Sequence, residues 1–256
     1  MPVITITSDF GTKDHYAASV RGALFRQLPG ATFSEISNQV PAFDVSVGAY
    51  LVAQAYPEYP AGSIHIVAVN SGGGGRFDHV AVQMNGHFFV GCNNGIFSLI
   101  SDKPADKVIQ IAASGKEPST FCARDLYVPA AVKLATGIAI EKLGVTLPDI
   151  ARLSRPVAPP EENVLKGVVQ YVDSFGNVIT NISGEEFDRV GMGRQFVIEL
   201  FKESINELHR TYADVNVGEK VAFFNSAGML EIAMNSGNAS GLLNLRLNSI
   251  IRIVFV

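Results

Sequence analysis

Residues 3–25 read VITITSDFGTKDHYAASVRGALF, and the change of period within this stretch decides the fold class. The segment 3–7 is apolar and β-branched, which predicts a strand, whereas Val20, Leu24 and Phe25 recur at helical spacing. A polar loop separates the two segments. A strand, a loop and a helix in this order predict an α/β domain, in which ligands collect in the loops that follow the strands.

The alternation of strand and helix continues downstream. Asn85-Gly86 is the strongest signal that two residues can give for a tight hairpin, and alternating apolar residues flank it on both sides. The further elements expected in this half are a helix at 49–55, strands at 64–69, 79–84, 87–90 and 108–112, and a helix at 129–136. Helices between strands favour a parallel or mixed sheet that helices cover.

The pattern of alternating strands and helices stops at residues 155–162, RPVAPPEE. This proline-rich, charged segment cannot supply the regular backbone hydrogen bonds of a sheet. We therefore expect an α/β domain over 1–153, a linker over 154–164, and a small all-β barrel or sandwich over 165–256. The strands expected in this last domain are 165–172, 178–182, 196–201, 220–224, 230–234 and 250–256.

Composition narrows the possible partners. The chain has 20 Lys and Arg against 24 Asp and Glu, so it has no basic surplus for nucleic acid or for an anionic membrane. We find neither a signal-like start nor an apolar run of about 20 residues, and we expect a soluble, cytoplasmic protein. Cys92 and Cys122 lack metal-ligand spacing, so neither a disulfide framework nor a zinc site is indicated.

Two loops that follow expected strands carry groups suited to a ligand. Asp9 and Asp14 can grip a sugar diol or a metal ion, or Asp9 turns the chain and Asp14 caps the next helix. The four glycines between Asn70 and Arg76 let backbone amides approach a ligand, or they form a plain surface loop. This second loop is not a phosphate-binding fingerprint, because it lacks both the GxGxxG step into a helix and a Gly-Lys-Ser/Thr ending.

Three further segments leave both a functional and a structural interpretation open. The side-chain amides of Asn93-Asn94 can hydrogen-bond to donor and acceptor groups of a ligand, or the two residues form a turn. Cys122 resembles a catalytic thiol only where a base lies nearby, while Arg124 can pair internally and Asp125 can cap the following helix. The turn 173–177 combines an acid, an aromatic ring and an amide, which suits a purine, but it is also a good hairpin turn. Structural or surface roles are expected for His65, His79, His87 and His209.

Taken in order, these pieces resemble the family of S-adenosyl-L-methionine (SAM) hydroxide adenosyltransferases, or SAM hydrolases, and their relatives the SAM-dependent fluorinases and chlorinases. The resemblance covers essentially the whole chain. It rests on the segments SDFG (8–11), PAFD (41–44), YP (56–57), GSIH (62–65), NNG (93–95), FCARD (121–125), DSFGNVITN (173–181), NS (225–226) and LEIA (230–233).

The resemblance implies an α/β domain followed by a β-barrel, and a homotrimer in which SAM lies between the first domain of one subunit and the second domain of its neighbour. It implies that the following residues bind the substrate: Asp9 at the ribose hydroxyls, Asp14 and Tyr16 near the methionine carboxylate, Phe43 near the reacting carbon, Asp173 and Ser226 at the amino group, Phe175 packed on the ligand, Asn177 with Ser236 at adenine, and Phe10, Asn94 and Phe121 in the matched motifs.

The catalytic positions depart from the family pattern. Family hydrolases use an Asp-Arg-His set to orient and deprotonate water; Asn70 stands at the Asp position, Cys122 at the His position, and Arg76 is the candidate for the Arg. An amide can orient water but is no carboxylate base. The halogenases instead surround the halide with hydroxyl groups, which Gly73 and Ala123 do not provide.

The sequence therefore favours a SAM hydrolase that forms adenosine and L-methionine, with activity weakened by the replaced groups and with SAM as substrate rather than cofactor. Three alternatives stay open: a non-catalytic protein that binds an adenosyl ligand, a SAM-dependent halogenase, and a metallohydrolase built on Asp9 and Asp14. For the leading hypothesis we expect no metal, no nucleic acid and no membrane partner.

Overall fold

A computed structural model of the protein describes residues 1–72, 77–112, 119–153, 163–200 and 202–256. The chain divides into two compact units, Met1–Ser154 (unit 1) and Arg155–Val256 (unit 2). The linker expected over 154–164 lies outside the described residues except for its last two positions. No helix in the described ranges is long and apolar enough to cross a membrane.

Unit 1 is built on a mixed sheet with the strand order β2-β1-β3-β5-β4-β6-β7. Its strands are β1 (Val3–Ser8), β2 (Thr32–Ser37), β3 (Ile64–Ala68), β4 (His79–Met84), β5 (His87–Cys92), β6 (Lys107–Ile111) and β7 (Gly144–Thr146). From β2 to β5 the neighbouring strands run parallel, and β4, β6 and β7 add antiparallel pairs. The parallel strands place the ends of β1, β3 and β5 along one edge, which we call the carboxyl edge.

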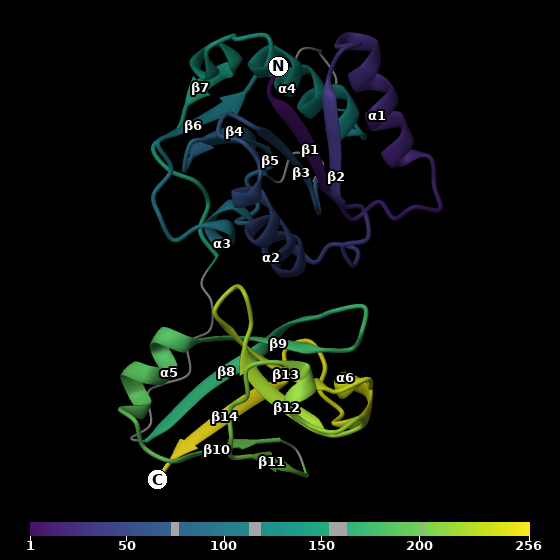
Figure 1. Cartoon of the computed structure of the whole chain (residues 1–256). Coiled ribbons are helices and arrows are strands. Elements are labelled where there is room, and N and C mark those ends of the chain that lie inside the picture. The colour runs from purple at the N-terminus through teal and green to yellow at the C-terminus, as the bar shows by residue number, and fades with distance from the viewer. Residues whose placement is uncertain (73–76, 113–118, 154–162, 201) are drawn as a thin grey trace. The chain divides into compact units, whose positions relative to one another are not determined.

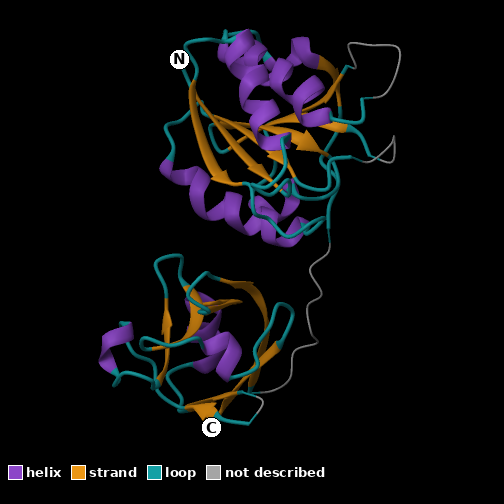
Figure 2. Ribbon diagram, turned by 90° about the vertical axis from the view of Figure 1, so that its right-hand side faces the viewer, coloured by secondary structure: helices purple, strands orange, loops and turns teal. Residues whose placement is uncertain are grey.

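Helices cover both faces of this sheet (Figures 1 and 2). They are α1 (Tyr16–Gln27), α2 (Val45–Ala55), α3 (Phe97–Ile100) and α4 (Val128–Ala135), with short turns η1 (Tyr56–Glu58), η2 (Ala123–Tyr127) and η3 (Ile140–Leu143). On the face under α1 and α4, Ile4, Ile6 and Ile66 pack with Leu24 and Tyr127 in one core, and none of these five side chains is more than 1% exposed. This core packs α1 against β1, and therefore positions the loop between them.

The local signals of unit 1 explain most of its elements. Asn85 and Gly86 both have positive φ, 51° and 77°, as a tight hairpin turn requires, so the predicted hairpin is confirmed. Asp44 begins α2 by accepting a hydrogen bond from the Val47 amide at 3.0 Å. The suggested cap at Asp14 is wrong, because His15 occupies the N-cap of α1 and makes no side-chain capping bond.

Unit 2 is an antiparallel sheet with the order β11-β10-β14-β8-β9-β13-β12, nearly closed and resembling a barrel. Its elements are β8 (Val164–Val172), β9 (Val178–Ser183), α5 (Gly184–Gly191), β10 (Phe196–Glu199), β11 (Ser204–Ile205), η4 (Tyr212–Asp214), β12 (Lys220–Phe224), β13 (Met229–Met234), α6 (Ala239–Leu242) and β14 (Ile250–Phe255). Lys220 on β12 donates to Glu203, just before β11, at 2.5 Å, so this ion pair links the two ends of the sheet. The predicted fold class, α/β followed by an all-β barrel, is confirmed.

Candidate functional site

The carboxylate of Asp9, directly after β1, organises the carboxyl edge of unit 1. Its Oδ2 accepts two backbone hydrogen bonds, from the amide of Phe43 and from that of Asn70, both at 3.0 Å. Both donors have positive φ, 67° and 49°. Asparagine tolerates this conformation, but a bulky aromatic residue there is a true outlier, and such strain collects at functional sites. Asp9 therefore stabilises two unusual backbone positions, one of them strained.

The second oxygen of Asp9 is the one that can meet a ligand. Within the described ranges no hydrogen bond reaches Oδ1, and the side chain is half-buried at the end of the strand. Phe43, which the Asp9 carboxylate fixes, is 72% exposed. A fixed carboxylate oxygen beside a projecting aromatic ring suits a ligand that carries both hydroxyl groups and a flat or apolar part.

Three of the expected substrate residues form one aromatic group beside Asp9. The ring centroid of Phe121 lies 5.6 Å from that of Phe10 and 5.3 Å from that of Tyr16, and both contacts are edge-on. Phe10 and Tyr16 themselves are 5.9 Å apart. Asp14 is exposed in the same loop. The structure thus brings together the segment after β1 and the segment before η2, which are more than a hundred residues apart in the sequence.

Asn94 supports the backbone on which Asn70 sits. Its Nδ2 donates to the carbonyl oxygens of Val69, at 3.0 Å, and Asn70, at 3.4 Å. Its Oδ1 accepts from the Ile96 amide at 3.3 Å. Both ends of this buried amide are thus used inside the protein. Arg76, the third candidate of the catalytic set, lies outside the described residues, as do Gly73, Gly74 and Gly75.

Cys122 has a base beside it that the sequence did not indicate. Its Sγ lies 3.5 Å from Nε2 of His79 and 3.4 Å from the carbonyl oxygen of Ser119. Nδ1 of His79 lies 2.7 Å from the hydroxyl of Tyr127. His79 comes from β4, 43 residues before Cys122, so no local pattern could have paired them.

The protonation states of Cys122, His79 and Tyr127 follow from their burial. Burial lowers the pKa of His79, while the nearby Asp78 works in the opposite direction. Burial also raises the pKa of the Cys122 thiol and raises that of Tyr127 well above its ordinary value. At neutral pH the group therefore consists of a thiol, a neutral imidazole and a phenol.

Arg124 and Asp125 lie beside this group but pair with each other. The Arg124 guanidinium donates to both carboxylate oxygens of Asp125, at 2.6 and 2.9 Å, which confirms the internal pairing expected for Arg124. Asp125 is not a helix cap: it lies within the π-helical turn η2 and also accepts from the Ser119 hydroxyl at 2.7 Å. The capping interpretation is wrong because the helical segment already begins at Ala123, with Cys122 as its N-cap, so Asp125 lies inside it.

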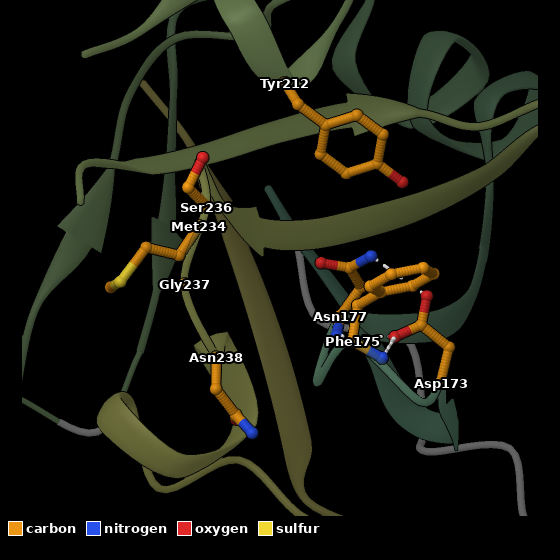
Figure 3. Close-up of a pocket in the computed structure, with 8 residues that line it drawn as sticks. All are labelled: Asp173, Phe175, Asn177, Tyr212, Met234, Ser236, Gly237 and Asn238. Atoms are coloured by element: carbon orange, nitrogen blue, oxygen red, sulfur yellow. Dashed lines mark hydrogen bonds between the residues drawn. The ribbon is translucent and has the colours of Figure 1, made fainter. Parts of the chain in front are cut away.

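Unit 2 contains a pocket of about 710 Å³ at the turn between β8 and β9 (Figure 3). It is lined by Asp173, Phe175, Asn177, Tyr212, Met234, Ser236, Gly237 and Asn238. The turn with Phe175 and Asn177 lies on one side of the pocket and the segment with Met234 and Ser236 on the other (Figure 3). Ser226 is not among the lining residues, because it lies in the turn at the opposite end of β13 from Ser236.

Asp173 holds the turn that carries the exposed ring. Its Oδ1 accepts from the amides of Phe175, at 2.9 Å, and Asn177, at 2.8 Å, and its Oδ2 accepts from Nδ2 of Asn177 at 2.9 Å. Phe175 is 79% exposed. The turn therefore presents a flat apolar ring to solvent and keeps Oδ1 of Asn177 beside it, an arrangement that suits stacking and edge recognition of a heterocycle.

Tyr212 is a pocket residue that the sequence analysis missed. Its hydroxyl donates to the buried carboxylate of Glu231 at 2.6 Å, and Asn225 donates to the other carboxylate oxygen at 3.1 Å. Burial and this carboxylate raise the pKa of Tyr212. Glu231 lies within a motif that marked the family resemblance, but its partner is 19 residues away, on the segment before β12. Across the described parts of both units, no group of three His, Cys, Asp or Glu side chains is arranged to hold a metal ion.

Comparisons with known proteins cover both units. The sequence model of the SAM hydroxide adenosyltransferase N-terminal domain matches residues 4–144, and that of the C-terminal domain matches residues 167–252. The chain is 32% identical to a protein named (R)-S-adenosyl-L-methionine hydrolase from Thermus thermophilus, over 96% of this chain and 97% of that protein. A fluorinase from an Actinoplanes species is 24% identical over 96% of this chain and 95% of its own length. A solved structure of an uncharacterized conserved protein from Thermotoga maritima superposes with a TM-score of 0.90 at 27% identity, covering 98% of this chain and all of that one.

Proposed function

The chain belongs to the SAM hydroxide adenosyltransferase family, and from this premise we propose that it hydrolyses S-adenosyl-L-methionine to adenosine and L-methionine. The hydrolase relative supports this activity more strongly than the fluorinase relative, since its identity is 32% against 24% over comparable lengths. SAM is the substrate in this proposal, and the reaction needs no cofactor because the positively charged sulfur already provides a leaving group.

One observation carries the proposal: the Asp9 carboxylate has one oxygen fixed by two backbone amides and the other left open within the described residues. A carboxylate held this way is preorganised to accept hydrogen bonds from the two ribose hydroxyls. With the ribose fixed, the projecting ring of Phe43 lies close to the adenosyl carbon, and the aromatic group of Phe10, Tyr16 and Phe121 excludes water from one side of it. Unit 1 thereby supplies the ribose half of the site.

Unit 2 supplies the recognition of the base. Phe175 stacks on the adenine, and Oδ1 of Asn177, to which no residue in the described ranges donates, accepts a hydrogen bond from the exocyclic amine of adenine. Two large rings, Phe43 and Phe175, are exposed in a single chain, each next to a carboxylate held by backbone amides. We propose that a homotrimer covers them, with unit 2 of one subunit completing the site on unit 1 of the next.

In the reaction, a water oxygen forms a bond to the ribose carbon that carries the sulfur. The carbon–sulfur bond breaks with its electron pair moving to sulfur, which leaves neutral methionine, and the water loses one proton. Asn70, fixed beside Asp9 through its amide, has a side-chain amide that can orient this water but cannot take the proton. The rate therefore depends on alignment and on a proton acceptor elsewhere.

The test is to incubate the purified protein with SAM and to separate the products by chromatography. The proposal predicts adenosine and methionine in equal amounts, with kcat/KM lower in Asp9→Asn and unchanged in the matched surface variant Asp102→Asn. The fluorinase relatives make a parallel incubation with fluoride and chloride informative, because a halogenated adenosine would contradict hydrolysis. Calorimetric binding of SAM and adenosine without any product would indicate an adenosyl-ligand binding protein instead.

A further inference from the structure

His79 begins β4 at the carboxyl edge where the candidate site lies. It pairs in register with Cys92, the last residue of β5. Val67 on β3 pairs with Gly91 on β5. Cys92, the next residue of β5, therefore lies level with the end of β3, just before Asn70. Adjacent strands lie about 4.8 Å apart, so His79 stands roughly 10 Å across the sheet from the strand that leads to Asn70. An imidazole is thus present near the candidate site.

Cys122 and Tyr127 both contact this imidazole, one at each nitrogen. Cys122 is the N-cap of η2, a π-helical turn, and Tyr127 is its last residue, so the two are five residues apart. The i to i+5 hydrogen bonding of a π turn is rare and occurs frequently at functional sites. Here the turn lets two residues of one segment reach the same ring of His79.

The residue before Cys122 joins this group to the ribose half of the site. Phe121 packs edge-on against Phe10, in the loop after β1 that also carries Asp9, and against Tyr16, the first residue of α1. Cys122 therefore lies between the aromatic group of the Asp9 loop and His79. The other titratable groups near His79 are Asp78, just before β4, Cys92 on β5 and Tyr127 on η2.

We propose that His79 is the proton acceptor of the reaction, that the Cys122 thiol passes the proton to it, and that Tyr127 is a positioning residue for the ring. This inference rests on the proposed hydrolysis of SAM. As the water oxygen bonds to the ribose carbon and methionine leaves, a water proton moves to Sγ of Cys122 and the thiol proton moves to Nε2 of His79. Nδ1–H of His79 donates to the Tyr127 hydroxyl throughout, and the imidazolium later returns its proton to solvent.

The kinetic test compares kcat and KM across pH for the wild type and variants of these three residues. A base must be unprotonated, so wild-type kcat falls at acid pH with an inflection below the ordinary histidine value of 6.5. His79→Gln lowers kcat by about 100-fold, leaves KM nearly unchanged and removes the acid inflection. Cys122→Ser keeps a hydroxyl that passes a proton and retains more activity than Cys122→Ala, while Tyr127→Phe lowers kcat and keeps the acid inflection.

Two results would overturn the assignment: a His79→Gln variant with the wild-type acid inflection, or equal losses in Cys122→Ser and Cys122→Ala. A second arm does not depend on turnover. The ring resonances of the five histidines are followed by NMR, with His79 assigned from the His79→Gln spectrum. Saturating adenosine shifts the His79 signal if the ring lies at the site, and an unshifted signal contradicts the inference. Failure to form adenosine from SAM contradicts the proposed function instead, so the two failures are distinguishable.

Discussion

Replacing Asp9 by Ala removes an acceptor that fixes the backbone of Phe43 and Asn70, and it also removes the oxygen assigned to the ribose. Two charge-assisted hydrogen bonds at a half-buried site amount to about 3 kcal/mol of unfolding free energy. Asp9→Asn keeps one oxygen that accepts both amides, so it lowers the unfolding free energy by only about 1 kcal/mol. The two variants therefore separate the structural role of Asp9 from its role in binding.

The assay is urea unfolding combined with calorimetric titration of adenosine. Asp9→Ala loses both stability and affinity, whereas Asp9→Asn keeps most of its stability but binds adenosine roughly 10- to 100-fold more weakly, since its second side-chain atom is no longer a charged acceptor. Asp14→Ala, an exposed Asp of the same loop, is the matched control for stability and leaves it unchanged. Wild-type stability in Asp9→Ala would refute the backbone role, and wild-type affinity in Asp9→Asn would refute the ribose contact.

Three further changes test other parts of the structure. Burial and His87 lower the pKa of the buried His65 from 6.5 to about 3, so the unfolded state binds more protons below pH 6.5. Urea unfolding should show less stability at pH 5 than at pH 7, and His65→Gln should reduce this difference by about 2 kcal/mol. Phe175→Ala should weaken adenosine binding by roughly tenfold or more in calorimetry, while a stability change without an affinity change would argue against stacking. Tyr212→Phe leaves the buried Glu231 carboxylate without one hydrogen bond and should cost about 2 kcal/mol in urea unfolding, and an unchanged midpoint would show that the bond adds little.

The sequence predicts those elements whose pattern is set locally. The strands and helices around the Asp9 loop have clear apolar periodicity, and Asn85-Gly86 fixes its hairpin through two positive φ angles. The strand β2 was missed because TFSEIS lies at the sheet edge, where no residue is fully buried and the apolar pattern is weak. The helix α5 was missed because it is short and polar, although Ser183 caps it at the Glu186 amide.

The residues of the candidate site also differ in whether a local sequence pattern could identify them. Asp9 and Asp14 could be identified as candidates because they share the loop after β1, where an α/β sheet places its ligands, whereas Phe10 and Tyr16 were indicated only by the family resemblance. The contacts of Cys122 with His79, and of Tyr212 with Glu231, join separate strands and depend on sheet order and register. Such contacts leave no local pattern in the sequence, so the partner of Cys122 could be found only in the folded chain.

The most direct test of the account is the reaction run in water enriched with heavy oxygen, with the adenosine product analysed by mass spectrometry. Attack of water at the ribose carbon bonded to sulfur predicts that each new adenosine carries one heavy oxygen in the hydroxyl group on that carbon. Adenosine without the label, or SAM recovered intact after prolonged incubation, would contradict the proposal that this chain is a SAM hydrolase.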